Sequence, residues 1–103
     1  MKRLTLAFSI VLSMFFVLFA SAEPVKIGIL SSLSGPAAGT GLAQKAGFEL
    51  ALEEINAAGG VLGEPLQIII EDDQANAEAA IAAFEKLMTE DEVEFIGGAF
   101  QAV

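Results

Sequence analysis

The side chains that could perform chemistry in this chain are hydroxyls, amides and carboxylates. The hydroxyls gather at Ser31, Ser32, Ser34 and Thr40, and a carboxylate run is formed by Glu71, Asp72 and Asp73. Gln101 adds an amide close to a pair of glycines. Such groups hydrogen-bond the polar atoms of a small ligand, but no nucleophile stands out beside a base. These residue types favour non-covalent binding, and we predict no catalytic residue.

Four missing residue types narrow the possible chemistry further. The chain contains no Cys, His, Trp or Tyr. Without Cys there are no disulfides, no thiolate metal sites and no cysteine that could carry a lipid anchor. Without His the chain lacks the usual proton shuttle and the commonest metal ligand. We therefore predict neither a metal nor a cofactor.

The first 22 residues have the pattern of a cleaved signal peptide. Lys2 and Arg3 form a positive segment, residues 4–19 are almost entirely apolar, and residues 20–22 (Ala-Ser-Ala) form a small-residue cleavage site. An uncleaved membrane anchor is the alternative. The apolar run is short for a span of about 20 residues, however, and no stop-transfer charges follow it. We expect export and cleavage after residue 22.

The charge balance of the chain is strongly acidic. Five basic residues stand against 14 acidic ones, and loss of Lys2 and Arg3 with the leader would move the formal net charge from −9 to −11. Affinity for nucleic acid depends on Lys and Arg side chains that neutralise phosphates. We therefore expect no nucleic-acid partner and place the protein in an open aqueous compartment.

The first half of residues 23–103 predicts a strand, a loop and a helix. Residues 25–30 are apolar and β-branched, as is typical of a central strand. Residues 31–41 are rich in Ser and Gly and predict a loop, whereas residues 42–57 have helical periodicity. The predicted inward face of this helix is Phe48, Ala51, Leu52 and Ile55, with Lys45, Glu49 and Glu53 pointing away. The glycines at 59–60 should end it.

The second half predicts a strand, a helix and a third strand. Residues 66–70 are a second buried strand, and the carboxylates that follow should end it. Asn76 is the expected N-cap of the next helix, and Glu78 in its first turn suits the helix dipole. The predicted core stripe of that helix is Ala77, Ala80, Ile81, Phe84, Leu87 and Met88. Residues 93–96 are the third strand.

This order of elements predicts an α/β fold with an open parallel sheet and right-handed crossovers. Ligands of such sheets bind beyond the carboxyl ends of the strands, where the hydroxyls of this chain lie. A parallel sheet needs helices on both faces, yet no helix follows the third strand. We expect residues 23–103 to be the opening piece of a larger domain. A minimal three-stranded domain is the alternative.

A glycine-rich segment suggests phosphate binding, but its spacing does not fit. Residues 39–41 supply the first two glycines of a G-x-G-x-x-G fingerprint, whereas Gln44 replaces the third. A P-loop requires Ser or Thr after its lysine, and Lys45 is followed by Ala46. We therefore disfavour nucleotide binding.

The carboxylates and serines each admit two interpretations. Residues 71–73 could bind Ca²⁺ or Mg²⁺ but lack the spacing of a calcium loop, so a solvated strand end that helps to cap the next helix is favoured. The serines at 31, 32 and 34, with the N–H groups of the following helix, could bind a carboxylate or another polar group. Ordinary turn chemistry is an equally open interpretation for them.

Three motifs occur in one order along residues 23–103. They are Leu33-Ser34-Gly35-Pro36, Ile55-Asn56-Ala57-Ala58-Gly59-Gly60-Val61 with Gly63, and Glu71-Asp72-Asp73. Together they resemble the start of the branched-chain amino-acid-type substrate-binding proteins of ABC transporters, the type I periplasmic binding proteins. The resemblance implies two α/β lobes that close on a ligand, with residues 23–103 as the N-terminal part of lobe one.

The resemblance also implies a function and its partners. A periplasmic protein, not lipid-anchored and expected to be a monomer at full length, would capture an amino acid or similar metabolite and deliver it to a membrane permease. The motif residues 56–60 and 35–36 are expected to be scaffold. A ligand-sensing domain of a receptor, or less favourably an exported hydrolase, is the alternative function.

The resemblance points to Ser34, Thr40, Phe100 and Gln101 as ligand contacts. In relatives that bind amino acids, a Ser or Thr after the third strand holds the ligand's carboxylate and ammonium groups, and this position falls on Gln101. Relatives often carry an aromatic side chain where this chain has Thr40. Both departures leave amides, urea-like compounds and other small acids open as ligands.

Overall fold

A computed structural model describes residues 23–99 of the protein. Its elements are β1 (Val25–Ser31), α2 (Ala38–Ala57), β2 (Leu66–Asp72), α3 (Ala77–Thr89) and β3 (Phe95–Gly98). The predicted signal peptide at 1–22 and the proposed contacts Phe100 and Gln101 lie outside the described residues. Within them, no helix is long and apolar enough to span a membrane.

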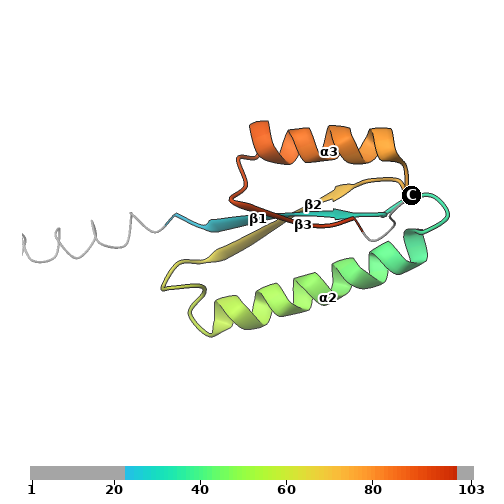
Figure 1. The fold of residues 1–103 in the computed structure, drawn as a ribbon. Helices are drawn as coiled ribbons and strands as arrows, with labels where there is room; N and C mark the ends of the chain where they lie inside the picture. Colours follow the sequence, from blue (N-terminus) through green and yellow to red (C-terminus); the bar gives the residue numbers. More distant parts are fainter. Residues whose placement is uncertain (1–22, 100–103) are drawn as a thin grey trace, which may run out of the picture.

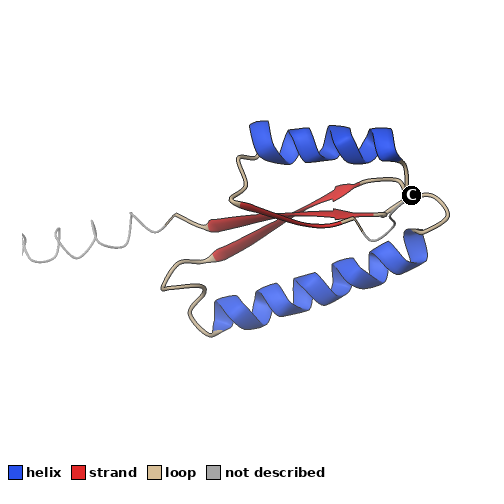
Figure 2. Cartoon of the chain, viewed as in Figure 1, coloured by secondary structure: helices blue, strands red, loops and turns tan. Residues whose placement is uncertain are grey.

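The three strands form one parallel sheet with the order β2-β1-β3. In the register of β1 with β2, Val25 pairs with Leu66 and Ser31 pairs with Asp72. Figure 2 shows the sheet nearly edge-on, with α3 on one face and α2 on the other. The predicted α/β fold with a parallel sheet is therefore confirmed.

The core lies between α3 and the sheet. Leu87 is completely buried there, and its cluster also contains Leu30, Ala83, Val93, Ile69 and Ile96. Helix α3 can approach closely because β1 carries Gly28 beneath it. A Cβ atom at position 28 would lie 3.0 Å from the methyl groups of Leu87. A small residue in the sheet thus makes room for a large one on the helix.

The predicted core stripe of α3 is partly wrong. Leu87 is buried, but Ile81, Phe84 and Met88 are 61%, 45% and 50% exposed, and Ala83 takes an inward place instead. Apolar side chains occur almost all round this helix, so periodicity alone could not decide which face meets the sheet. The small side chain of Ala83 and the contact of Leu87 with Gly28 decide it in the folded structure.

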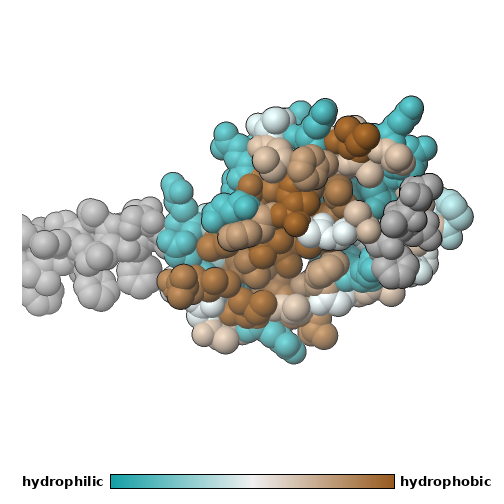
Figure 3. Space-filling model, viewed as in Figure 1, coloured by the Kyte–Doolittle hydropathy of each residue, from teal (hydrophilic) through white to brown (hydrophobic). Residues whose placement is uncertain are grey.

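Large apolar side chains also remain exposed elsewhere in the described portion. Figure 3 shows apolar atoms gathered between the two helices in the view of Figure 1. Phe95 of β3 is 62% exposed, and Leu50 of α2 is 59% exposed. These side chains add little hydrophobic stabilisation to the described portion, because that stabilisation scales with the apolar area removed from water.

Helix α2 begins earlier than predicted. It starts at Ala38 rather than Leu42, and its N-cap, Ala37, makes no side-chain hydrogen bond. Thr40 therefore lies inside the first turn of the helix instead of preceding it. The glycines of this segment are poor helix formers and predicted a loop. Tertiary packing overrides that preference, because buried Gly41 lies directly against the backbone of Ser32.

The other boundaries differ by two residues at most. Strand β2 continues through Glu71 and Asp72, and β3 runs over Phe95–Gly98 instead of residues 93–96. The predicted N-cap Asn76 is confirmed, since its side chain accepts hydrogen bonds from Glu78 N and Ala79 N at 2.8 and 3.2 Å.

The end of α2 is joined to the start of β2 by the side chain of Asn56. Its Nδ2 donates to Leu66 O and its Oδ1 accepts from Leu66 N, both at 2.8 Å. The neighbouring carbonyl of Pro65 accepts from Val25 N, so the polar groups of Leu66 point to the side of β2 that β1 does not occupy. These bonds agree with the prediction that residues 56–60 are scaffold. The Asn56 side chain occupies the first hydrogen-bonding position of β2, on the side where β2 is the edge of the sheet.

We expect Asn56→Ala to lower the free energy of unfolding by about 1–3 kcal/mol, because it removes two partners from the buried residue Leu66. Urea denaturation of the purified protein measures this loss. Asn56→Asp keeps the acceptor for Leu66 N but turns a charged oxygen toward Leu66 O in place of the donor, so it should be destabilised as well. Equal stability of wild type and Asn56→Ala would contradict the role assigned to these bonds.

Candidate ligand-binding edge

Two loops meet at the carboxyl edge of the sheet. Residues 32–37 follow β1 and residues 73–76 follow β2, and the pairing of Ser31 with Asp72 brings the two strand ends together. Asp73 N continues this pairing by donating to Ser31 O at 3.1 Å. The polar side chains that follow both strands are therefore neighbours, although about 40 residues separate them along the chain.

The Asp72 carboxylate holds the loop after β1. Its Oδ1 accepts from Leu33 N at 2.8 Å, Gln74 N at 2.9 Å and Ser34 N at 3.3 Å, and its Oδ2 accepts from Ser34 Oγ at 2.6 Å. The Ser34 hydroxyl is the largest cause that lowers the pKa of Asp72 below its usual 3.8, followed by the backbone donors; desolvation opposes them. Asp72 is therefore ionised at neutral pH.

This lowered pKa predicts a pH-dependent stability. In the unfolded chain Asp72 titrates near 3.8, so the stabilisation by its ionised form is complete above that pH and is lost as pH falls through the lower folded pKa. The difference in free energy of unfolding between wild type and Asp72→Asn should be constant near neutral pH and shrink in acid. Urea denaturation at several pH values measures it. Exposed Glu53→Gln is the control and should change stability little.

Asp73 and Ser32 form a buried pair under the two loops. Both side chains are 5% exposed, and Ser32 Oγ donates to Asp73 Oδ1 at 2.5 Å. Asp73 Oδ1 also accepts from Ala75 N at 2.9 Å. The interpretation of the carboxylate run as a solvated strand end is therefore wrong for Asp73, and the cap of α3 is Asn76. The register of β1 with β2 explains why Asp73 is buried, because it places the end of β2 next to the loop that follows β1.

Glu71, the remaining member of the carboxylate run, belongs to a separate network of hydrogen bonds. The Lys86 ammonium hydrogen-bonds the Glu71 carboxylate and contacts Asp91 Oδ2 at 3.1 Å. These hydrogen bonds, that of Glu71 first, raise the pKa of Lys86 to about 12. Within residues 23–99, no three Asp, Glu, His or Cys side chains are arranged to hold a metal ion.

The structure separates the predicted serines into two kinds. Ser31 and Ser32 are buried and donate inward; the single hydroxyl hydrogen of Ser31 has two acceptors in reach, Gln44 Oε1 at 3.1 Å and Gly41 O at 3.3 Å. Ser34 is exposed at the edge and is joined to Asp72. Thr40 is exposed on α2, where its N–H donates to Ala37 O. The sequence analysis did not identify Asp72 as the residue whose carboxylate holds the loop after β1. Its position directly after a predicted strand could have indicated this role.

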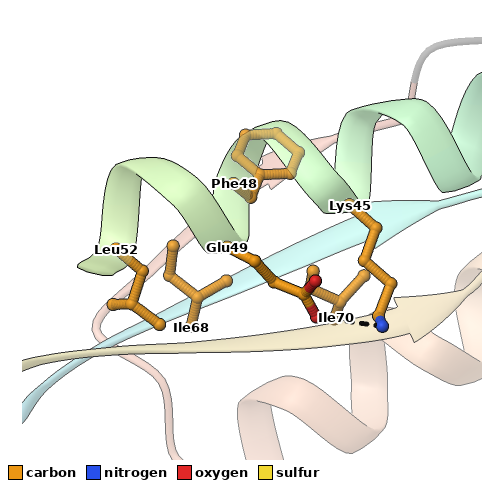
Figure 4. A pocket seen from close by; sticks show the side chains of 6 residues that line it. All are labelled: Lys45, Phe48, Glu49, Leu52, Ile68 and Ile70. Carbon is orange, nitrogen blue, oxygen red and sulfur yellow. Dashed lines mark ion pairs between the residues drawn. The ribbon is translucent and has the colours of Figure 1, made fainter. Parts of the chain in front are cut away.

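A hollow lies away from this edge, between α2 and β2. It has a volume of about 230 Å³ and is lined by Lys45, Phe48, Glu49, Leu52, Ile68 and Ile70 (Figure 4). Lys45 and Glu49 form an ion pair of 2.9 Å and line this hollow with the isoleucines of β2, so the prediction that both point away from the sheet is wrong. Their aliphatic stems cover the isoleucines while their charged groups reach water. Such half-exposed pairs add little stability.

Fold and site together define a class of protein. It is an α/β protein whose described polar groups organise loops at the carboxyl edge of a parallel sheet, the usual ligand position of such sheets. Residues 24–103 match the family model described as periplasmic binding protein. The chain belongs to this family, in its Leu/Ile/Val-binding type. It is a family of binding proteins rather than enzymes, in agreement with the prediction of non-covalent binding.

Curated relatives support this assignment. The chain is 38% identical over 78 residues to the leucine-, isoleucine-, valine-, threonine- and alanine-binding protein of Pseudomonas aeruginosa, covering 76% of this chain and 21% of the relative. It is 48% identical over 61 residues to Leu/Ile/Val-binding protein homolog 4 of Brucella abortus, covering 59% and 15%. The chain thus spans about a fifth or less of the length of these relatives.

Solved structures agree with the fold. The branched-chain amino acid transporter substrate-binding protein LivJ of Streptococcus pneumoniae, in complex with isoleucine, matches with a TM-score of 0.68 and 32% identity over 72% of this chain and 21% of its own. An ABC transporter substrate-binding protein of Sphaerobacter thermophilus matches with a TM-score of 0.64 and 38% identity over 72% and 19%.

Proposed function

We propose that residues 23–103 open the first lobe of an extracytoplasmic solute-binding protein of an ABC transporter. The observation that carries this proposal is the family match over residues 24–103. The protein captures an amino acid or a similar small polar metabolite and delivers it to a membrane permease. It is exported by the leader at residues 1–22 and works in the periplasm as a monomer.

The relatives' names suggest the ligand class to test first. The Pseudomonas relative is named for leucine, isoleucine, valine, threonine and alanine, and the Streptococcus structure contains isoleucine. We propose a branched-chain aliphatic amino acid for this protein. The proposed contacts are Ser34, Thr40, Phe100 and Gln101, of which Ser34 and Thr40 lie in the described residues.

Binding works without covalent chemistry in this proposal. The ligand lies between two lobes and stabilises the closed arrangement by its higher affinity for that state. The permease then recognises the closed form. The loops at the carboxyl edge of β1 and β2 supply part of the first lobe's surface, and Asp72 and Asp73 hold them in one arrangement before the ligand arrives.

A thermal-shift experiment on the full-length protein without its leader tests this function. L-leucine, L-isoleucine and L-valine are compared with small amides and with carboxylates that lack an amine. A ligand present at 100 times its Kd stabilises the folded state by about 2.7 kcal/mol, so a branched-chain amino acid should raise the Tm measurably. A well-folded protein whose Tm responds to no amino acid would contradict the proposal.

A further inference from the structure

Strand β2 is an edge of the sheet in the order β2-β1-β3, so one side of its backbone has no neighbouring strand in residues 23–99. The carbonyl of Pro65 bonds to β1, and the alternation of the ladder then turns the backbone groups of Leu66, Ile68 and Ile70 to the outer side. Within the described part of the chain, these groups of Ile68 and Ile70 have no hydrogen-bond partner. Open edge groups of this kind are a template for pairing with another strand.

The sequence of β2 is well suited to pairing with such a strand. Residues 66–70 read Leu-Gln-Ile-Ile-Ile, without a charge, a proline or a glycine, and β-branched side chains favour strands. A second copy of the protein carries the same edge, and two identical edges can pair around a two-fold axis. An unprotected β2 would therefore be a surface for association with a second copy.

The side chain of Asn56 blocks the first position of this edge. Its carboxamide donates to Leu66 O and accepts from Leu66 N, both at 2.8 Å. The peptide groups of an added strand would offer Leu66 the same kind of donor and acceptor, so the carboxamide takes their place. Because Asn56 lies in the last turn of α2, a strand that paired with Leu66 would have to displace this part of the helix as well.

A lysine–carboxylate ion pair lies on each face of β2 beyond this position. On the α2 face, Lys45 and Glu49 are 2.9 Å apart and line the hollow with the isoleucines of β2 (Figure 4). On the α3 face, Lys86 pairs with Glu71 of β2 itself. Lysines at a sheet edge disfavour pairing, because an added strand would remove their charge from water. Strand β3, at the opposite side of the described sheet, consists of Phe-Ile-Gly-Gly and carries no charge.

We propose that the edge of β2 is closed against a second copy of this protein, by the Asn56 carboxamide at its first position and by the two ion pairs along its faces. Asn56 thus has a role in the state of association besides its role in joining α2 to β2. The inference does not depend on the proposed function, since it concerns self-association and involves no ligand. It gives a physical reason for the monomer expected at full length.

Removal of the protecting side chains of α2 tests the proposal. Asn56→Ala, Lys45→Ala and Glu49→Ala are combined in the full-length protein without its leader, and the net charge stays unchanged because one charge of each sign is lost. We expect this combined variant to dimerise about tenfold more tightly than the wild type, as two ordinary hydrogen bonds would provide. Sedimentation velocity over a series of protein concentrations measures the dimerisation. A combined variant that stays monomeric wherever the wild type does would overturn the proposal.

Hydrogen exchange of the backbone amides shows which surface the dimer uses. In the wild type we expect the N–H of Leu66 to exchange slowly and those of Ile68 and Ile70 to exchange faster, because only Leu66 is bonded at the outer side. In the combined variant the amides of Ile68 and Ile70 should become protected as the protein concentration rises. Dimerisation without this protection would place the contact on another surface and would overturn the proposal.

Leu87→Ala separates edge pairing from a general loss of stability. It truncates a completely buried core side chain and leaves the outer side of β2 unchanged, so it should unfold at lower urea concentration but sediment as a monomer. Dimerisation of Leu87→Ala as tight as that of the combined variant would overturn the proposal. If Asn56→Ala fails to fold, the double variant Lys45→Ala with Glu49→Ala decides the question. It truncates side chains that are 41% and 58% exposed, and it should still dimerise more tightly than the wild type.

Discussion

Gly41→Ala is expected to lower the free energy of unfolding by about 3 kcal/mol, the upper end of the usual cost of overpacking. A Cβ atom at this position would lie 1.8 Å from Ser32 O and 2.5 Å from its carbonyl carbon. Backbone atoms cannot yield as a flexible side chain can, so α2 must move away from the loop. That shift would also remove the Ser31 hydroxyl from Gly41 O.

Gly39→Ala is the matched control for this prediction. Position 39 lies in the same turn of α2, and a Cβ atom there meets nothing within 4 Å. Alanine favours a helix over glycine by about 1 kcal/mol, so Gly39→Ala should be neutral or stabilising. Urea denaturation of both variants measures the contrast. Equal midpoints for the two variants would contradict the close contact at position 41.

Leu87→Ala should destabilise the protein by about 2–5 kcal/mol, the range measured for leucines removed from packed cores. Leu87 is 0% exposed and fills the space above Gly28, which has no side chain that could take its place. The variant would leave a cavity between α3 and β1. Its effect should be among the largest of any single truncation in the described core.

Ile81→Ala provides the comparison on the same helix. Ile81 is 61% exposed, so its truncation removes little buried area and should change stability by less than about 1 kcal/mol. Thermal or urea unfolding of both variants gives the difference. If Ile81→Ala were the more damaging variant, the face of α3 that meets the sheet would have to be the predicted stripe.

The serines that follow β1 show what the folded structure adds to the sequence. Sequence alone left two possibilities for the serine cluster, turn chemistry or ligand contact. The structure gives Ser31 and Ser32 to internal hydrogen bonds and leaves Ser34 exposed. A single carboxylate, Asp72, accepts a hydrogen bond from the exposed serine and fixes its position.

Part of the protein was predictable because it depends on neighbouring residues. The apolar β-branched runs predicted both long strands, and the order of elements predicted the parallel sheet. Asn76 was recognised as an N-cap because a cap involves residues two and three positions away. Helix α2 ends at Ala57, as the glycines that follow it predicted.

Other features depended on residues that the chain brings together from a distance. The bonds of Asp72 to Ser34 and of Asp73 to Ser32 span 38 and 41 positions, so no local pattern contains them. The early start of α2 depends on the contact of Gly41 with Ser32, and the inward face of α3 depends on Gly28 beneath Leu87. Local propensity and periodicity therefore determined which elements form and in what order. Packing between elements decided where they begin, which face they bury and which polar groups remain for a ligand, because close contact and burial arise only when the sheet is assembled.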